Sequence, residues 1–315
     1  MKKTVLLFLL AAGSIHAANG EIRALVPEPR TGSGWGWWMK RHQEKLQYIS
    51  TAEVGKVVFI GDSITHGWER PEATPEWKRY FSEGPYKALN LGYGADRTEH
   101  VLWRIDNGEL DGYEARVVVL MIGTNNTGHF SQSDEPPADT IIGVSAILER
   151  IAAKQPKAVT LLLPIFPRGR TADDPLRKRN NIVNKELKHL ADGKKVVWVD
   201  FTDRFIAADG SLSPEMMPDY LHFGGGNSSD RGAEGFKIWA SGVLPYIDAI
   251  LKRDANDDRV LANTYPAHAP AWEGGDRPVA AMPFTRILST LMPLARAKVG
   301  LEPAAVIAIP VLVRK

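Results

Sequence analysis

Short apolar runs that alternate with helix-like segments constrain the fold of this chain more than any other feature of its sequence. The runs span Val57–Ile60, Ala88–Leu91, Arg116–Ile122, Ala158–Pro164 and Lys195–Asp200. Two of them contain the continuously apolar stretches VVVLMIG and AVTLLLPI, a pattern typical of strands buried on both faces of a sheet. Strands that alternate with helices imply right-handed crossovers and a parallel sheet covered on both faces, so the sequence predicts an α/β domain.

The segments between and beside these runs have apolar residues at helical spacing. The predicted helices are Trp37–Ser50, Thr98–Asn107, residues 141–151, Pro175–Leu190 and Trp239–Lys252. In the first of them Met39, His42 and Leu46 share one face. We expect the last helix to pack back on the sheet.

One serine follows a predicted strand directly. In the stretch KVVFIGDSITHGW, Lys56–Trp68, the apolar run stops at Gly-Asp and Ser63 comes next, where a helix can begin. The carboxyl edge of a parallel sheet is where α/β proteins place ligands. Helix-start amides at that edge suit a nucleophile whose attack creates an oxyanion. From this segment alone, Ser63 is equally well explained as a helix cap.

Three further polar clusters lie at the ends of predicted strands. The stretch NLGYGADRT, Asn90–Thr98, can turn a backbone N–H into a cleft, or can be a plain Gly-rich turn. The stretch GTNN, Gly123–Asn126, offers a neutral amide donor for an oxyanion, or a cap for the next turn. In PDYLH, Pro218–His222, the spacing of Asp219 and His222 places a carboxylate beside an imidazole. Together with Ser63, the clusters favour an acyl-transfer site.

The composition excludes several other classes of protein. The formal net charge of +2 is too near neutral to indicate a nucleic-acid or membrane-surface partner. The chain has no cysteine, and its 8 histidines include no His-x-x-x-His pair. Neither a thiolate metal site nor a cysteine nucleophile is therefore expected, and we predict no metal and no other cofactor.

The two ends of the chain differ in character from the middle. The N terminus combines Lys2 and Lys3 with an apolar run and Ala17-Ala18, which is typical of a cleaved signal peptide, although a retained anchor is the alternative. We expect a secreted or periplasmic protein with no stable membrane insertion after cleavage. The oligomeric state is not predicted. The expected divisions are a signal peptide at 1–18, a linker at 19–36, the domain at 37–253 and a C-terminal extension at 254–315.

The four polar clusters resemble those of the SGNH (GDSL-type) hydrolases. The longer stretches LNLGYGADRTEHVLWRIDNGEL and LLLPIFPRG are similar to the branch that includes the platelet-activating-factor acetylhydrolase catalytic subunits and bacterial acetylesterase relatives. The resemblance covers roughly Trp37–Ile250. It implies a three-layer α/β/α flavodoxin-like fold around a central, mainly five-stranded parallel sheet.

The resemblance also implies roles for individual residues. Ser63 is then the nucleophile and, through its own N–H, an oxyanion donor. His222 is the base, Asp219 orients it, and Asn125 supplies a side-chain donor. The family has a glycine N–H as the remaining donor, and Ala95 stands at that position here. We expect the N–H of Ala95 to serve as the third donor, which requires backbone angles that suit a Cβ, because alanine tolerates fewer angles than glycine.

Several neighbouring residues have two readings each. Asp62, Gly94 and Arg168 are candidate substrate contacts, while Arg168 can equally pair with Asp173 or Asp174. His66 lies three residues past Ser63, and we expect it to be a polar residue of the first helical turn rather than a catalytic one. The aromatics Trp35, Trp37 and Trp38 either stack on sugars or cover an edge of the core. The stretch FGGGNSSDRGAEGF after His222 resembles an insertion, either a flap or slack chain.

These observations predict an exported serine esterase. The resemblance implies a short acyl group, most often acetyl, and we expect a small-molecule or glycan ester as substrate. A lipid esterase or lysophospholipase is the alternative within enzymes. The rival from another class is a non-catalytic carbohydrate-binding protein that uses the N-terminal tryptophans.

Overall fold

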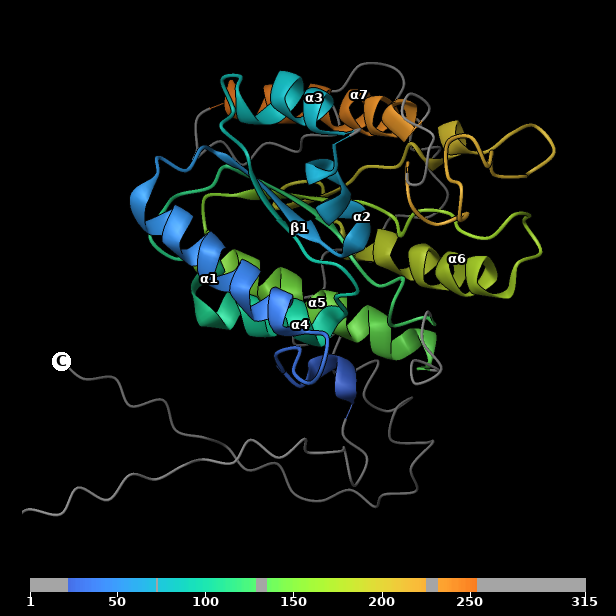
Figure 1. Ribbon diagram of the computed structural model, residues 1–315, viewed down its shortest axis with the longest axis horizontal. Helices are drawn as coiled ribbons and strands as arrows, with labels where there is room; N and C mark the ends of the chain where they lie inside the picture. The colour runs from blue at the N-terminus through green and yellow to red at the C-terminus, as the bar shows by residue number, and fades with distance from the viewer. Residues whose placement is uncertain (1–21, 72, 129–134, 225–231, 254–315) are drawn as a thin grey trace, which may run out of the picture. The chain divides into compact units, whose positions relative to one another are not determined.

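The computed structural model describes residues 22–71, 73–128, 135–224 and 232–253 (Figure 1). The predicted signal peptide, the predicted C-terminal extension and residues 225–231 of the predicted insertion lie outside the described residues. In the described part of the chain, no helix is long and apolar enough to cross a membrane.

Five parallel strands form the central sheet, in the order β2-β1-β3-β4-β5. The predicted α/β fold with a mainly five-stranded parallel sheet is therefore confirmed. The strands are β1 (Val57–Gly61), β2 (Leu89–Gly92), β3 (Val117–Met121), β4 (Val159–Leu162) and β5 (Val196–Trp198).

Helices cover both faces of this sheet (Figure 1). Helices α3 and α7 lie on one side, and α1, α4 and α5 lie on the other. The α-helices are α1 (Gly36–Thr51), α2 (Ser63–His66), α3 (Thr74–Trp77), α4 (Thr98–Arg104), α5 (Pro137–Lys154), α6 (Pro175–Leu187) and α7 (Gly232–Leu251). Single turns of 3-10 or π type are η1 (Arg23–Leu25), η2 (Gly67–Glu69), η3 (Lys78–Ser82), η4 (Ile105–Glu109), η5 (Lys188–Leu190) and η6 (Thr202–Phe205).

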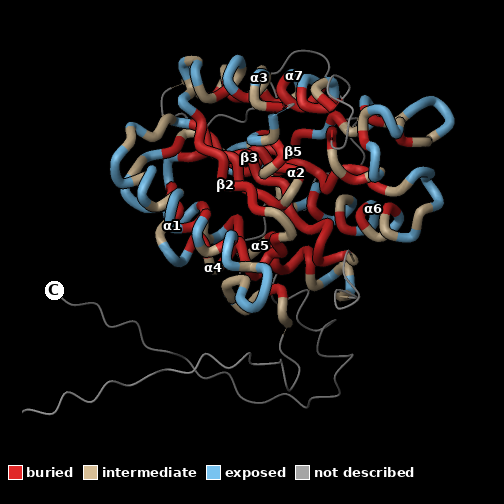
Figure 2. The backbone as a smooth tube through the Cα atoms, in the orientation of Figure 1, coloured by how far each residue is buried: buried red, intermediate tan, exposed pale blue. Residues whose placement is uncertain are grey.

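The central strands divide their side chains between two separate cores. In β1, Val57 and Phe59 point into one core while Val58 and Ile60 point into the other, as the pleat requires. The core under α3 and α7 is rich in aromatic rings, whereas the core under α4 and α5 is almost wholly aliphatic. Figure 2 shows the buried backbone that runs through the sheet between these two layers. Burial on both faces explains why the central strands read as uninterrupted apolar runs.

The N-terminal segment before α1 packs on the domain. Ala24 in η1 is fully buried, and its carbonyl accepts a hydrogen bond from Thr98 Oγ1 at 3.1 Å. The Glu28 N–H donates to the carbonyl of Glu99. Residues 22–35, which the sequence predicts to be linker, are therefore part of the folded domain. Their Pro-, Gly- and Arg-rich composition fits a linker, but the contacts that fix them are tertiary and leave no local pattern.

Candidate active site

Ser63 begins α2 directly after β1, at the carboxyl edge of the sheet. The side chain of Asp62 caps this helix by accepting a hydrogen bond from the Ile64 N–H at 3.0 Å. The helix cap is therefore Asp62 and not Ser63, the alternative that the sequence left open, and Ser63 is left with its hydroxyl available.

An imidazole and a carboxylate from a distant loop meet this serine. Ser63 Oγ lies 2.7 Å from His222 Nε2, and His222 Nδ1 lies 2.7 Å from Asp219 Oδ2. Asp219 Oδ1 also accepts the backbone N–H groups of Leu221 and His222, at 3.0 and 2.7 Å. The structure thus brings the three predicted residues into one hydrogen-bonded chain.

Asp219 is held by hydrogen bonds rather than by burial, since its side chain is 55% exposed. Partial burial by itself would raise the pKa of this carboxyl group, but hydrogen bonds from the ring and backbone of His222 outweigh it and lower the pKa below its usual range. The carboxylate therefore stays ionised wherever the protein is folded near neutral pH, and it fixes the ring orientation of His222.

Ala95 and Asn125 lie together on the loops after β2 and β3. Ala95 adopts a φ of 63°, in the left-handed region that alanine rarely occupies. Asn125 Nδ2 donates one hydrogen bond to the carbonyl of Asp96 at 2.8 Å. A primary amide has a second N–H, which remains to donate elsewhere. The backbone at Ala95 thus adopts an angle that glycine takes more readily than alanine.

The backbone N–H of Gly94 already makes a hydrogen bond. It donates to His66 Nδ1 at 3.2 Å, so this N–H does not serve as an oxyanion donor, and Ala95 is left as the backbone donor of the loop. Burial, then the positive charge of Arg41, lowers the pKa of His66 to about 4, with Glu69 opposing. His66 is therefore a neutral ring that supports the loop, in keeping with its predicted non-catalytic place on α2.

Two of the three predicted substrate contacts are buried side chains, and their contact with a substrate stays a prediction. Asp62 is fully buried, and burial raises the pKa of its carboxyl group to about 6. Arg168 is only 8% exposed, and its guanidinium donates to the Thr124 hydroxyl at 3.1 Å and to the Gly128 carbonyl at 3.2 Å. Both side chains are therefore buried beside the site and are not exposed on its surface. Sequence position does not reveal this burial, whereas Gly94 is partly exposed and its substrate contact stays a prediction.

The loop that follows β2 and carries Ala95 and Asp96, here called the oxyanion loop, is supported by Trp38, Arg104 and Arg30. Of these, the sequence singled out only Trp38, as a residue that stacks on sugars or covers an edge of the core. Trp38 Nε1 and Arg104 Nε donate to the two oxygens of the buried Asp96, at 2.6 and 2.9 Å. Arg30, from the segment expected to be a linker, donates to the Ala95 carbonyl. No sequence signal marks this group, because its members come from three separate elements.

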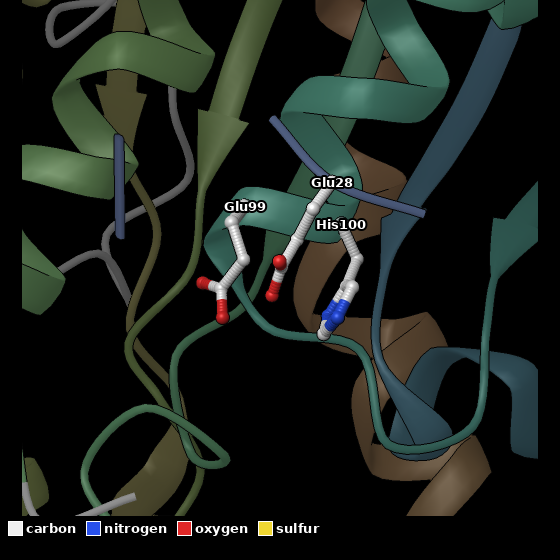
Figure 3. A group of neighbouring side chains, drawn as sticks. All are labelled: Glu28, Glu99 and His100. Carbon is white, nitrogen blue, oxygen red and sulfur yellow. The ribbon is translucent and has the colours of Figure 1, made fainter. Parts of the chain in front are cut away.

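A second polar cluster contains Glu28, Glu99 and His100 (Figure 3). Its three side chains are close enough to hold a metal ion, but both carboxylates already have cationic partners. Arg23 pairs with Glu28 at 2.9 Å, and Arg97 pairs with Glu99. A further cation would compete with these arginines, so we interpret the cluster as a structural ion-pair network.

Sequence comparison identifies the proteins that this chain resembles. A model of the GDSL-like Lipase/Acylhydrolase family matches residues 59–226. The platelet-activating factor acetylhydrolase IB subunit alpha1 of Homo sapiens is 37% identical over 190 residues, which cover 60% of this chain and 77% of that protein. The Rattus norvegicus protein of the same name is 36% identical over 208 residues, or 65% and 84% of the two chains.

Solved structures share the fold at lower sequence identity. A GDSL-like lipase from Bacteroides thetaiotaomicron is 19% identical with a TM-score of 0.50, and the match covers 67% of this chain and 97% of that one. A Bacteroides fragilis protein assigned as an acylhydrolase is 20% identical with a TM-score of 0.52, over 67% and 97% of the two chains.

The left-handed backbone of Ala95 predicts a stabilising substitution. A left-handed angle costs an L-residue about 1–2 kcal/mol, and glycine is free of that cost. Ala95→Gly should therefore raise the free energy of unfolding by about 1 kcal/mol, measured by urea denaturation. Ala146→Gly, in the helical backbone of α5, is the matched control and should lower it by about 0.5–1 kcal/mol. Equal losses in both variants would contradict the strain at Ala95.

The neutral ring of His66 predicts a pH-dependent stability. An unfolded imidazole binds its proton near pH 6.5, whereas His66 in the folded protein binds it only near pH 4. The unfolded chain therefore holds more protons between these values, and the wild type should lose stability relative to His66→Asn as the pH falls from about 6.5 to about 4. Urea unfolding at several pH values measures the difference, with the exposed His189→Asn as control for the substitution. Parallel curves for wild type and His66→Asn would refute the prediction.

Proposed function

Because the chain belongs to the GDSL-like lipase/acylhydrolase family and is a carboxylic ester hydrolase, we propose that it removes short acyl groups, acetyl in particular, from carbohydrate esters. The observation that carries the proposal is the continuous hydrogen-bonded chain from Ser63 through His222 to Asp219. Export is part of the proposal and is supported by the signal-like pattern of residues 1–18. N-terminal sequencing of the mature protein would test it, since an intact Met1 on the mature protein would contradict cleavage.

In the proposed reaction, His222 takes the proton of Ser63 as the serine oxygen attacks the ester carbonyl. Three donors, the N–H groups of Ser63 and Ala95 and the free amide N–H of Asn125, stabilise the oxyanion that forms. The tetrahedral intermediate expels the alcohol, which receives its proton from His222 and leaves an acyl group on Ser63. Water, activated by the same imidazole, then attacks the acyl group and releases the acid.

Charge is balanced throughout these steps. His222 becomes an imidazolium each time it accepts a proton, and the ionised Asp219 at 2.7 Å stabilises that cation. The carboxylate remains ionised because three hydrogen bonds lower its pKa. The oxyanion donors are neutral N–H groups, so no charged group has to be desolvated to stabilise the oxyanion.

Different observations support the proposed acyl group and the proposed alcohol part of the substrate. The curated relatives are named as acetylhydrolases, which supports an acetyl group. The same name makes platelet-activating factor a candidate substrate under the predicted alternative of a lipid esterase or lysophospholipase. The catalytic geometry also weighs against the rival prediction of a non-catalytic carbohydrate-binding protein, because a binding protein has no use for a serine that is hydrogen-bonded to an oriented imidazole.

Substitutions at Ser63 and Asn125 test the mechanism. Ser63→Ala should abolish nearly all hydrolysis of p-nitrophenyl acetate, because no nucleophile remains. Asn125→Ala should lower kcat about 100-fold or more through loss of one oxyanion donor. The controls are Ser50→Ala and Asn107→Ala, at exposed positions on α1 and η4, with the melting temperature recorded for each variant. Wild-type turnover by Ser63→Ala would disprove the assignment.

The size of the acyl group is tested by varying the ester. We expect kcat/KM for p-nitrophenyl acetate to exceed that for p-nitrophenyl octanoate by at least about tenfold. A binding preference of this size corresponds to about 1.4 kcal/mol in transition-state stabilisation. A clear preference for the octanoyl ester would instead favour the lipid esterase alternative.

A further inference from the structure

We propose that Trp37, together with Trp35 and His66, forms a platform beside the catalytic serine that binds one sugar ring of the substrate. The inference rests on the proposed function and identifies the part of the protein that would select a carbohydrate ester. It assigns a substrate-binding role to the start of α1 and to Trp35, which lies in the segment that the sequence predicts to be a linker.

The two adjacent tryptophans near the start of α1 have different environments. Trp38 is fully buried against the oxyanion loop, whereas Trp37 is 39% exposed. The ring of Trp37 stacks on His66, with 5.9 Å between ring centres and an angle of 25° between planes. Trp35 adds a second ring, 6.0 Å from Trp37 and tilted by 45°. An exposed tryptophan with rings beside it is a surface on which an apolar face of a ligand can stack.

Two observations place the platform next to the catalytic groups. His66 lies three residues after Ser63 in α2, so the two side chains share one face of that helix. A Cβ added to Gly94 would lie 3.3 Å from the Cη2 atom of Trp37, which places the indole against the loop that carries Ala95. A ring stacked on Trp37 therefore lies beside the loop that would hold the oxyanion.

Arg30 fixes the platform to the oxyanion loop. Its guanidinium lies 4.1 Å from the ring centre of Trp35 and donates to the Ala95 carbonyl. The side chain of Arg30 is only 11% exposed, so it is a largely buried link between the Trp35 ring and the Ala95 carbonyl. Tryptophan rings held in place before binding lose little conformational freedom when a ligand stacks on them, which favours affinity.

The charges around the platform favour a neutral sugar over a cationic headgroup. Arg30 already stacks on Trp35, and Arg41, Lys45 and Arg70 contribute positive charge at His66, which Glu69 only partly offsets. A quaternary ammonium group would meet these like charges. A sugar ring has a C–H face for the indole and hydroxyl groups for hydrogen bonding.

His66 can supply the matching polar contact. Because its Nδ1 accepts from Gly94, the neutral ring carries its proton on Nε2. Within the described residues, Nε2 makes no hydrogen bond, so this N–H remains to donate to a sugar hydroxyl. Ligand sites commonly combine an aromatic surface with a few such placed donors.

The test compares two esters in Trp37→Ala. The substrates are partially acetylated xylohexaose and p-nitrophenyl acetate, and the readout is the ratio of their kcat/KM values. We expect this ratio to fall about tenfold or more, mainly through KM for the oligosaccharide, and to be partly restored in Trp37→Phe. Tyr48→Ala is the matched control, since Tyr48 is an exposed aromatic on the same helix and should leave the ratio unchanged. A ratio in Trp37→Ala within twofold of the wild type would overturn the platform.

Two further measurements separate this inference from the proposed function. If the wild type hydrolyses neither ester, the proposed function fails, and the platform is then judged by calorimetric binding of unacetylated xylohexaose. Binding that is lost in Trp37→Ala supports it, and equal binding by both proteins, or none by the wild type, refutes it. If Trp37→Ala instead lowers hydrolysis of platelet-activating factor more than that of the oligosaccharide, the platform serves a lipid ester and the carbohydrate assignment is wrong.

Discussion

Helix α2 can lie on the ends of β1 and β2 only because no side chains separate them. Gly61 and Gly92 are paired residues at the ends of these strands, directly beside the helix that carries Ser63. A Cβ on Gly61 would collide with the Thr65 side chain, and one on Gly92 would collide with the backbone of His66. The two glycines therefore set how closely the serine approaches the sheet. The loops that carry Ala95 and Asn125 follow β2 and β3 at the same edge of the sheet.

Buried charged side chains hold the oxyanion loop in place. Asp96 accepts from Trp38 and Arg104, and Arg104 also pairs with the buried Glu109. Such a network is weak evidence for overall stability, because charges lose much of their hydration on burial. Its value here is geometric, since the carbonyl of Asp96 holds the Asn125 amide and the preceding residue carries the backbone donor. The loop is thus fixed by α1 and α4 rather than by its own sequence.

The sequence was informative wherever a function leaves a local pattern. Apolar runs predicted the sheet, and the residues after them predicted the meeting of Ser63 with His222, although 159 positions separate the two in the chain. Local patterns carry no record of burial, so the sequence did not show that Asp62 and Arg168 are buried. The tertiary contacts of residues 22–35 were missed for the same reason. Trp37 and Trp38 show the limit most clearly, because helical phase alone gives two identical neighbours opposite environments.

The packing of residues 22–35 bears on where this protein can be shortened. A chain that begins at Trp37 keeps every residue of the Ser–His–Asp set, yet it lacks the arginine that braces Ala95 and the ring that Arg30 covers. It also uncovers the Thr98 hydroxyl at the start of α4, which now bonds to the Ala24 carbonyl. Trimming to the minimal shared fold would therefore leave the catalytic groups present and the loop beside them unsupported.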